Sequence, residues 1–264
     1  MKIIDAHCHI YPDKIAEKAA SATGRFYDIE MDLDGKVSTL LREGAAAGID
    51  HFIVQSVATT PAQVSSINRF IAEEVANSGG MMTGLGTLHP DSEDIKGDVE
   101  QLLELGLRGV KLHPDIQGFK LDDYRCLKIY ELCEGRLPLL LHTGDHRYDF
   151  SNPNRLKPIL DTYSDLVVIG AHFGGWSMWE RAAEQLHGYD NLYVDCSSSL
   201  YAISPETGRR LVRCYGADRV LFGTDYPMWS PTEELERFYA MGLSAAENEK
   251  ILYRNTAQLF SIDV

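Results

Sequence analysis

The segment KIIDAHCH, residues 2–9, is the strongest structural signal in the sequence, because it reads as a short buried strand that ends in two histidines. Side chains alternate between the two faces of a strand, so His7 and His9 are expected on one face and Cys8 on the other, in the core. Two imidazoles on one face of a strand end are a suitable start for a metal site. Taken alone, the pair fits a metal site and an inert strand end equally well.

The rest of the chain alternates apolar runs with helical patterns. Strands are expected at residues 51–57, 81–88, 109–112, 137–141, 166–171, 191–196 and 219–223, with a helix after each. Repeats of roughly 25–30 residues have the size of a βα unit. Together with the first strand, they predict a (β/α)8 TIM barrel in a single domain, residues 1–264. A doubly wound open sheet is disfavoured, because no glycine-rich phosphate fingerprint follows the first strand.

Two local features complete this interpretation of the fold. Residues 11–35 form a long insertion after the first strand, with one short helix expected at residues 13–22. A connection of this length is either a lid over the barrel or a decorative insertion, which does not cover the active site. After the sixth strand, Ser177 and Glu180 match a capping box, so Ser177 is expected to begin the next helix.

Composition narrows the class of protein. The 264 residues are 44% hydrophobic and 24% charged, which is typical of a globular chain. The five cysteines form no CxxC pair, and the sequence starts without a signal peptide, so we expect reduced thiols and a cytoplasmic location. A net charge of −14 disfavours nucleic acid and anionic membranes as partners, and no apolar run would span a bilayer. A small-molecule substrate is the expected partner, and the choice between a monomer and a homo-oligomer stays open.

Polar side chains follow five of the predicted strands, at His7 and His9, KLHP (111–114), LHTGD (141–145), AHFGG (171–175) and GTDYP (223–227). The carboxyl ends of barrel strands meet at one face, where active sites lie. Three imidazoles and one carboxylate suit Zn²⁺, with Mn²⁺ or Fe²⁺ as alternatives, so we predict that His7, His9, His142 and Asp225 bind a metal. His172 is then expected beside the metal as a proton carrier or as an electrostatic group.

These motifs, with the closing segment KILYRNTAQLF at residues 250–260, resemble the amidohydrolase superfamily. More narrowly, the chain is similar to the amidohydrolase-related branch (amidohydrolase 2), which includes aminocarboxymuconate-semialdehyde decarboxylase. The resemblance runs from end to end of the chain. It implies a barrel that holds one divalent metal through His7, His9, His142 and Asp225, with His172 as the catalytic residue.

The fourth strand leaves an alternative open. Binuclear members of the superfamily bridge two metals through a carboxylated lysine or a glutamate, and Lys111 lies on the corresponding strand. A carboxylated Lys111 implies two ions, whereas a free Lys111 is a clamp for a substrate anion, which is the interpretation that we favour. His113 shares the strand face of Lys111, so it is a second substrate-binding candidate or an inert rim histidine. Asp195 either faces the site from the seventh strand or caps a helix.

Three functions are consistent with these residues. The first is a metal-dependent hydrolase of a small amide, lactone or ester, in which Asp225 takes a proton from the metal-activated water and His172 stabilises the oxyanion. The alternative is a lyase, a non-oxidative decarboxylase or hydratase of an unsaturated or aromatic acid. The metal would orient its carboxylate, and Lys111, with Arg147 as a further candidate, would hold a second anionic group. The third, a metal-stabilised binding scaffold, is disfavoured because sites at this barrel face are nearly always catalytic. The identity of the substrate depends on loop shape and does not follow from the sequence.

Overall fold

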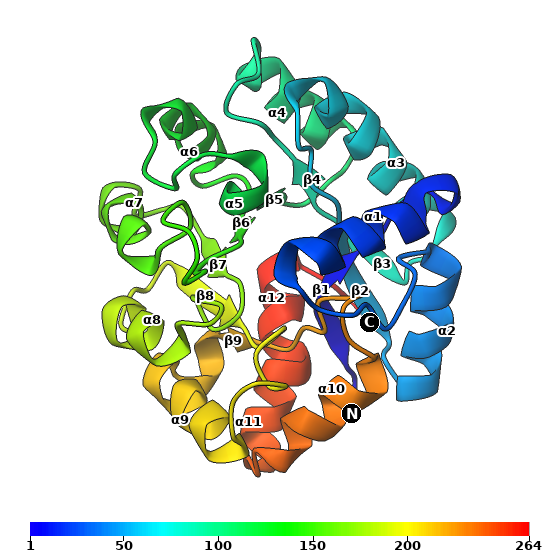
Figure 1. The fold of residues 1–264 in the computed structure, drawn as a ribbon, viewed down its shortest axis with the longest axis vertical. Coiled ribbons are helices and arrows are strands. Elements are labelled where there is room, and N and C mark those ends of the chain that lie inside the picture. Colours follow the sequence, from blue (N-terminus) through cyan, green and yellow to red (C-terminus); the bar gives the residue numbers. More distant parts are fainter. Residues whose placement is uncertain (264) are drawn as a thin grey trace.

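Parallel strands form a barrel that helices surround, and the computed structural model describes residues 1–263 (Figure 1). The strand segments are β1 (Ile4–His9), β2 (His51–Gln55), β3 (Met82–Gly84), β4 (Gly86–Thr87), β5 (Val110–Leu112), β6 (Leu139–Leu141), β7 (Val168–Gly170), β8 (Leu192–Asp195) and β9 (Val220–Leu221). β3 and β4 are two parts of one predicted strand, interrupted at Leu85. The described residues therefore contain the predicted set of strands in the predicted order.

Hydrogen bonds between backbone atoms join the strands into a closed wall. β1, β2 and β3 pair in sequence order, and so do β4 to β9. Leu85 N donates to Val54 O at 2.9 Å, which connects the two sheets on one side. On the other side, Ala6 N donates to Phe222 O at 2.8 Å and His9 N to Tyr226 O at 2.7 Å. The first and last strands are therefore neighbours, and the predicted TIM barrel is confirmed.

The longer helices cover the outside of the barrel, with α1 as the exception. The α-helices are α1 (Asp13–Tyr27), α2 (Val37–Ala47), α3 (Val64–Asn77), α4 (Ile95–Glu104), α5 (Pro114–Gln117), α6 (Leu127–Cys133), α7 (Lys157–Thr162), α8 (Trp179–Leu186), α9 (Pro205–Tyr215), α10 (Pro231–Ala240), α11 (Ala245–Glu249) and α12 (Asn255–Phe260). Short turns of other helix types are η1 (Pro61–Gln63), η2 (Tyr124–Cys126), η3 (Pro153–Arg155), η4 (Ala217–Arg219) and η5 (Lys250–Arg254). No helix within residues 1–263 has the length and apolar character needed to cross a membrane.

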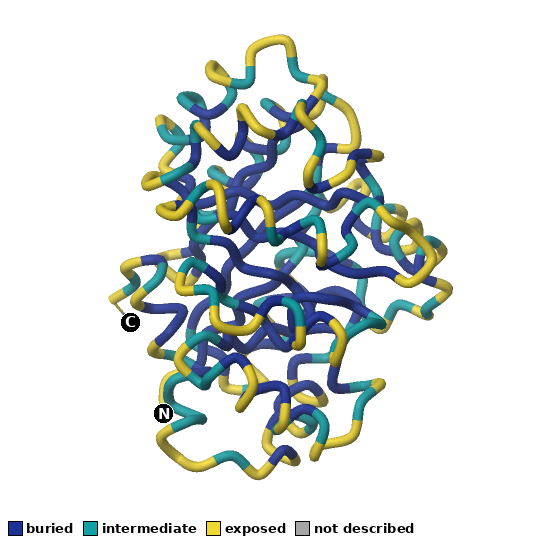
Figure 2. The backbone as a smooth tube through the Cα atoms, turned by 90° about the vertical axis from the view of Figure 1, so that its left-hand side faces the viewer, coloured by how far each residue is buried: buried dark blue, intermediate teal, exposed yellow. Residues whose placement is uncertain are grey.

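Apolar packing fills both sides of the strand wall. Inside the barrel, Ile4, Ile53, Leu140, Ile169 and Leu221 pack together, and Phe260 of α12 joins this cluster. A larger cluster, which includes Cys8, lies between the strands and the outer helices. The strand backbone is accordingly buried in the centre of the molecule, whereas exposed positions concentrate on helices and loops (Figure 2). The expected core position of Cys8 is confirmed.

The insertion after β1 contains α1, which lies across one end of the barrel (Figure 1). The predicted helix at residues 13–22 is five residues too short, because α1 continues to Tyr27. Gly24 lies within the helix at a close backbone contact, because a Cβ there would lie 2.7 Å from Ile29 O. The helix ends instead at Asp28, whose φ of 56° is left-handed. The additional turn brings Tyr27 to the ends of the strands.

Candidate metal centre

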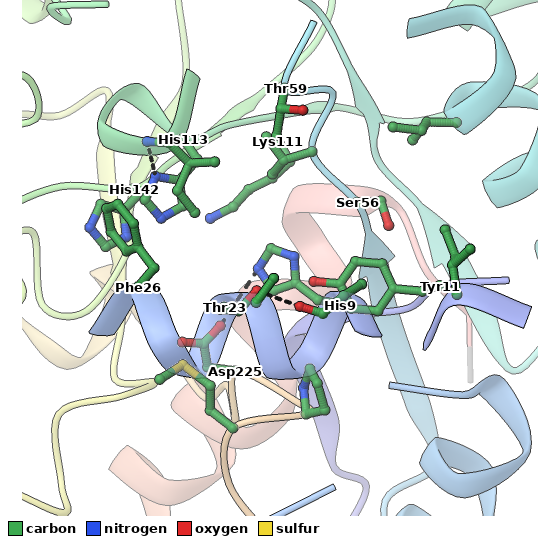
Figure 3. Close-up of a pocket in the computed structure, with 18 of the residues that line it drawn as sticks. His9, Tyr11, Thr23, Phe26, Ser56, Thr59, Lys111, His113, His142 and Asp225 are labelled. Atoms are coloured by element: carbon green, nitrogen blue, oxygen red, sulfur yellow. Dashed lines mark hydrogen bonds and ion pairs between the residues drawn. The ribbon is translucent and has the colours of Figure 1, made fainter. Parts of the chain in front are cut away.

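Three of the predicted metal ligands converge at the carboxyl ends of β1 and β9. The Nε2 atoms of His7 and His9 lie 3.2 Å apart. Oδ1 of Asp225 lies 3.3 Å from His7 Nε2 and 3.6 Å from His9 Nε2, and Figure 3 shows Asp225 facing His9. One donor atom from each residue falls within 4.8 Å of the others, which is close enough to share one ion.

A buried carboxylate orients His7. Oδ2 of Asp195 lies 2.9 Å from His7 Nδ1, and both side chains are fully buried. Burial alone would raise the pKa of Asp195, but the charge and hydrogen bond of His7, together with Ser197, lower it to about 2. Because the charged Asp195 accepts the proton on Nδ1, His7 presents the lone pair of Nε2 to the cavity. Asp195 therefore faces the site through His7 and does not cap a helix.

His142 and His172 present two further nitrogen lone pairs to each other. His142 Nε2 lies 3.1 Å from Gly144 O, and His172 Nδ1 lies 3.0 Å from Ser197 O. A carbonyl oxygen only accepts, so His172 Nδ1 carries the hydrogen in this contact. The Ser197 hydroxyl, which also lies 3.0 Å from Nδ1, gives its own hydrogen to Asp195 at 2.5 Å and agrees with this assignment. The remaining nitrogens, His142 Nδ1 and His172 Nε2, lie 3.2 Å apart. Two lone pairs at this distance repel unless a cation or a proton lies between them.

The chemistry of this donor set fits a divalent metal. Burial lowers the pKa values of His9 and His142 well below the usual range, so both imidazoles are neutral, which is the ligating form. Within the described residues, however, His142 does not join the close group of His7, His9 and Asp225; its nearest candidate group contains His113 and Asp115. The assignment of His142 to the same ion as His7 and His9 therefore stays a prediction.

Asp225 is held as a carboxylate in a constrained position. Burial would raise its pKa, but His7, His172 and His9, with a 2.5 Å hydrogen bond from Ser198, together lower it strongly. Its φ of 59° and the φ of 60° at His172 are both left-handed. Such backbone conformations are uncommon outside glycine and are found where surrounding structure fixes a functional side chain.

Lys111 carries its ammonium into the barrel. The side chain is buried, and Nζ lies 3.2 Å from His7 Nε2. In Figure 3 it points into the space between His9 and His142. Burial lowers the pKa of Lys111 to about 8, although Asp225 and Asp195 act in the opposite direction. An amine with a lowered pKa is suitable for carboxylation, and a buried ammonium is suitable for an anion, so both interpretations of Lys111 stay open.

His113 and Tyr27 form a pair at the edge of the metal centre. The ring of His113 stacks on His142 with centroids 3.9 Å apart, and its Nδ1 accepts from Ile116 N. His113 Nε2 is then the donor to the Tyr27 oxygen, at 2.5 Å. The hydrogen of the Tyr27 hydroxyl is left for a group in the cavity. Sequence reasoning missed Tyr27, because nothing in the insertion indicates that residue 27 reaches the strand ends.

One cavity of about 520 Å³ connects these residues with the outside. His7, His9, Lys111, His142, His172 and Asp225 line its inner end, and side chains of α1 and α3 line its outer end. Arg147 is not among the lining residues. Its guanidinium contacts Asp145 at 2.7 Å and donates to Phe26 O at 2.7 Å, so it fixes the end of α1 instead of holding a substrate anion. The contact of Arg147 with a substrate stays a prediction, which these interactions do not support.

The sequence matches the family model described as amidohydrolase over residues 4–262. The chain belongs to the amidohydrolase family. As a member of this family, the protein is a metal-dependent enzyme, and the donor set described above is suitable for the divalent ion. Among curated proteins, none matches the chain.

Solved structures share the amidohydrolase fold at low identity. An uncharacterized TIM-barrel protein from Bordetella bronchiseptica is 23% identical with a TM-score of 0.81, over 99% of both chains. A provisionally named 2-pyrone-4,6-dicarboxylic acid hydrolase from Pseudomonas putida is 21% identical with a TM-score of 0.70, over 100% of this chain and 98% of the other. A dihydroxybenzoic acid decarboxylase from Polaromonas sp. JS666, with manganese and 2-nitroresorcinol bound, is 19% identical with a TM-score of 0.73, over 98% and 97%. These likenesses establish the fold and do not assign a substrate.

Proposed function

We propose that this amidohydrolase is a hydrolase of a small amide, lactone or ester. The observation that carries the proposal is the Asp225 carboxylate, which lies beside His7 and His9 with a strongly lowered pKa. His7, His9, His142 and Asp225 would hold the divalent metal, with zinc as the first candidate and manganese or iron as alternatives. When bound, the metal would lower the pKa of a water molecule and polarise the substrate carbonyl.

Asp225 is the proposed general base. It is ionised at neutral pH, and its Oδ1 lies 3.3 Å from His7 Nε2 and 3.6 Å from His9 Nε2, where it would accept a proton from the attacking water. Ser198 occupies Oδ2 through its hydrogen bond, whereas Oδ1 faces the two histidines. The proton would therefore pass through Oδ1 and then to the leaving group.

We retain His172 as a catalytic residue and favour the first of its two expected roles, a proton carrier, over an electrostatic group for the oxyanion. Burial lowers the pKa of His172 to about 4, so the ring is neutral at pH 7, and its Nε2 presents a lone pair. A lone pair does not stabilise an oxyanion, so His172 would act as an acceptor or ligand. The Lys111 ammonium and the Tyr27 hydroxyl are the donors that would stabilise the developing negative charge.

A decarboxylase is the second candidate, and the cavity favours it in one respect. Its outer walls are apolar, and Lys111 is its one ammonium or guanidinium group within residues 1–263. When CO₂ leaves, the electron pair of the broken carbon–carbon bond and its negative charge pass to the carbon, where a proton neutralises them. Apolar surroundings disfavour the localised charge of the starting carboxylate and so favour this step. Lys111 would hold the carboxylate of the unsaturated or aromatic acid, and a protonated side chain would deliver a proton to carbon.

A paired assay separates the two reactions. The purified protein is loaded with zinc or manganese, the bound ion is counted by elemental analysis, and activity is measured on two panels. Ester, lactone and amide turnover followed by acid release supports the hydrolase. CO₂ release from aromatic and unsaturated acids, without turnover of the first panel, would replace it with the decarboxylase. A protein that binds no stoichiometric metal would contradict both.

A further inference from the structure

The outer end of the cavity is a mostly apolar channel between α1 and α3, which Thr23 and Ser66 also line. Ile15, Ala19, Ala22 and Phe26 line it from α1, at the spacing of one helix face. Ile67 and Phe70 line it from α3. We call these six residues the tail subsite.

Part of the tail subsite stays open to the cavity, although Phe26, Ile67 and Phe70 also pack against neighbouring apolar clusters. Ile15 keeps 47% of its surface exposed. Ala19 and Ala22 are small residues on the same face of α1, so they leave room where a leucine would fill the channel. The buried face of the same helix is a different one, formed by Ala16, Ala20, Gly24 and Tyr27. α1 therefore has one apolar face that packs on the barrel and another that is directed at the cavity.

Charge is confined to the inner end of the cavity. Within the described residues, Lys111 is its one ammonium or guanidinium group and Asp225 its one carboxylate. Arg147 is occupied by Asp145 and by the backbone of Phe26. A ligand with a second anionic group would place that group beside Ile67 and Phe70. No ammonium or guanidinium group lines that end of the cavity, and neutral polar side chains such as Ser66 compensate little of the desolvation of a charge.

We propose that the enzyme acts on substrates with a single polar head and an apolar tail. The head would lie between the metal ligands and Lys111, and the tail would lie in the tail subsite between α1 and α3. This substrate class rests on the proposed function, because the metal centre fixes the position of the head. An enzyme of this kind would differ in substrate from enzymes that act on small dicarboxylic acids.

A chain-length series tests the proposal by binding. The probes are n-alkyl hydroxamates from acetohydroxamate to octanohydroxamate, whose head groups chelate divalent metals. Their affinities are measured by titration calorimetry on the zinc-loaded and the metal-free protein. Each added methylene that enters the subsite should raise the affinity by about fourfold, since burial of one methylene contributes about 0.8 kcal/mol.

Two variants locate the effect, and a third is the matched control. Ala22→Trp fills the channel, and Ile15→Glu places a carboxylate in it. In both variants an added methylene should leave the affinity for the hydroxamate nearly unchanged. Ala46→Trp carries the same change at an exposed alanine of α2, outside the cavity, and should keep the fourfold gain. Thermal unfolding checks that each variant is folded.

The outcomes distinguish the subsite from the metal centre. A gain with chain length in both protein forms, lost in Ala22→Trp and Ile15→Glu, supports the tail subsite. Equal affinities along the series in both forms would overturn it, even where the hydroxamate head binds in a metal-dependent manner. A chain-length gain without any effect of zinc supports the subsite and contradicts the proposed metal chemistry.

Discussion

The inner and outer ends of the cavity differ in how their side chains are held. At the inner end, each charged group has a defined partner: Asp195 binds His7, and Ser198 binds Asp225. His7 and Asp195 lie in strands, and Ser198 and Asp225 follow strands closely, so their positions depend on the barrel itself. At the outer end, Ile15 and Phe70 lie on helices and contribute apolar surface without polar contacts to fix them.

This difference separates chemistry from substrate choice. Residues at strand ends are positioned by a hydrogen-bonded wall, and small errors there cost turnover. Residues of α1 are positioned by one helix of an insertion, so their replacement changes what binds while the metal centre stays intact. The predictions below test whether the two ends respond independently.

The largest expected effect is at the inner end. Asp225→Asn should lower kcat by about 10³-fold, because the general base is lost. Asparagine tolerates the left-handed backbone of position 225, so the fold should persist. Steady-state kinetics and circular dichroism measure the two properties. Asp190→Asn, at an exposed aspartate, is the control, and near-normal turnover of Asp225→Asn would refute the proposed base.

Tyr27 tests whether α1 serves only the outer end. Tyr27→Phe removes a hydroxyl that contacts His113 at 2.5 Å. We expect kcat to fall by about 10²-fold with little change in KM, as for the loss of one oxyanion donor. Tyr124→Phe, at an exposed tyrosine, should leave both constants unchanged. An unchanged kcat in Tyr27→Phe would restrict α1 to binding.

Glu234 is a buried carboxylate without the partners that Asp225 has. Burial raises its pKa to about 7, and within residues 1–263 its Oε2 has no hydrogen-bond partner. The folded state therefore retains a proton that the unfolded state releases near pH 4.5, and stability falls as the pH rises from 4.5 towards 7. In Glu234→Gln, the decrease in the free energy of unfolding between pH 5 and pH 8 should be smaller by about 2 kcal/mol.

Urea unfolding at the two pH values measures this effect. Glu233→Gln is the matched control, because Glu233 pairs with the same Arg237 but is exposed. A pH dependence that persists unchanged in Glu234→Gln would show that another group causes it.

The smallest expected effect concerns the attachment of α1. Arg147 donates to Phe26 O and lies within 5.4 Å of the ring centroids of Tyr27 and Trp176. Arg147→Ala should make the amides of α1 exchange about 10-fold faster, with KM raised and kcat nearly kept. Arg155→Ala, which removes surface pairs with Asp122 and Asp149, should not change α1 exchange. Hydrogen exchange measured by mass spectrometry distinguishes the two.

The inner end could be predicted from the sequence because strand ends are visible in it. His7, His9, His172 and Asp225 each follow an apolar run, and parallel strands bring such positions to one rim. The position of α1 could not be predicted, because it depends on contacts that are distant in sequence. Tyr27 reaches His113 only through the full length of α1 and its anchor at Arg147.

Local motifs failed where tertiary contacts compete with them. Ser177 was expected to cap the helix after the sixth strand, and this prediction is wrong. The helix begins at Trp179, Ser177 has a φ of 61°, and its hydroxyl accepts from His146 N. A serine that binds another loop cannot also satisfy the amides of a helix.

The closing contacts between the first and last strands have a consequence for synthesis of the protein. His7 and His9 leave the ribosome long before Asp225, and the backbone bonds from Ala6 and His9 to Phe222 and Tyr226 require the last strand to have been made. A nascent chain that stops before Asp225 has two imidazoles without the carboxylate that completes their group. A site that uses all the predicted ligands would therefore be complete only after the chain has been made through Asp225, and a product truncated before that residue should bind the ion weakly.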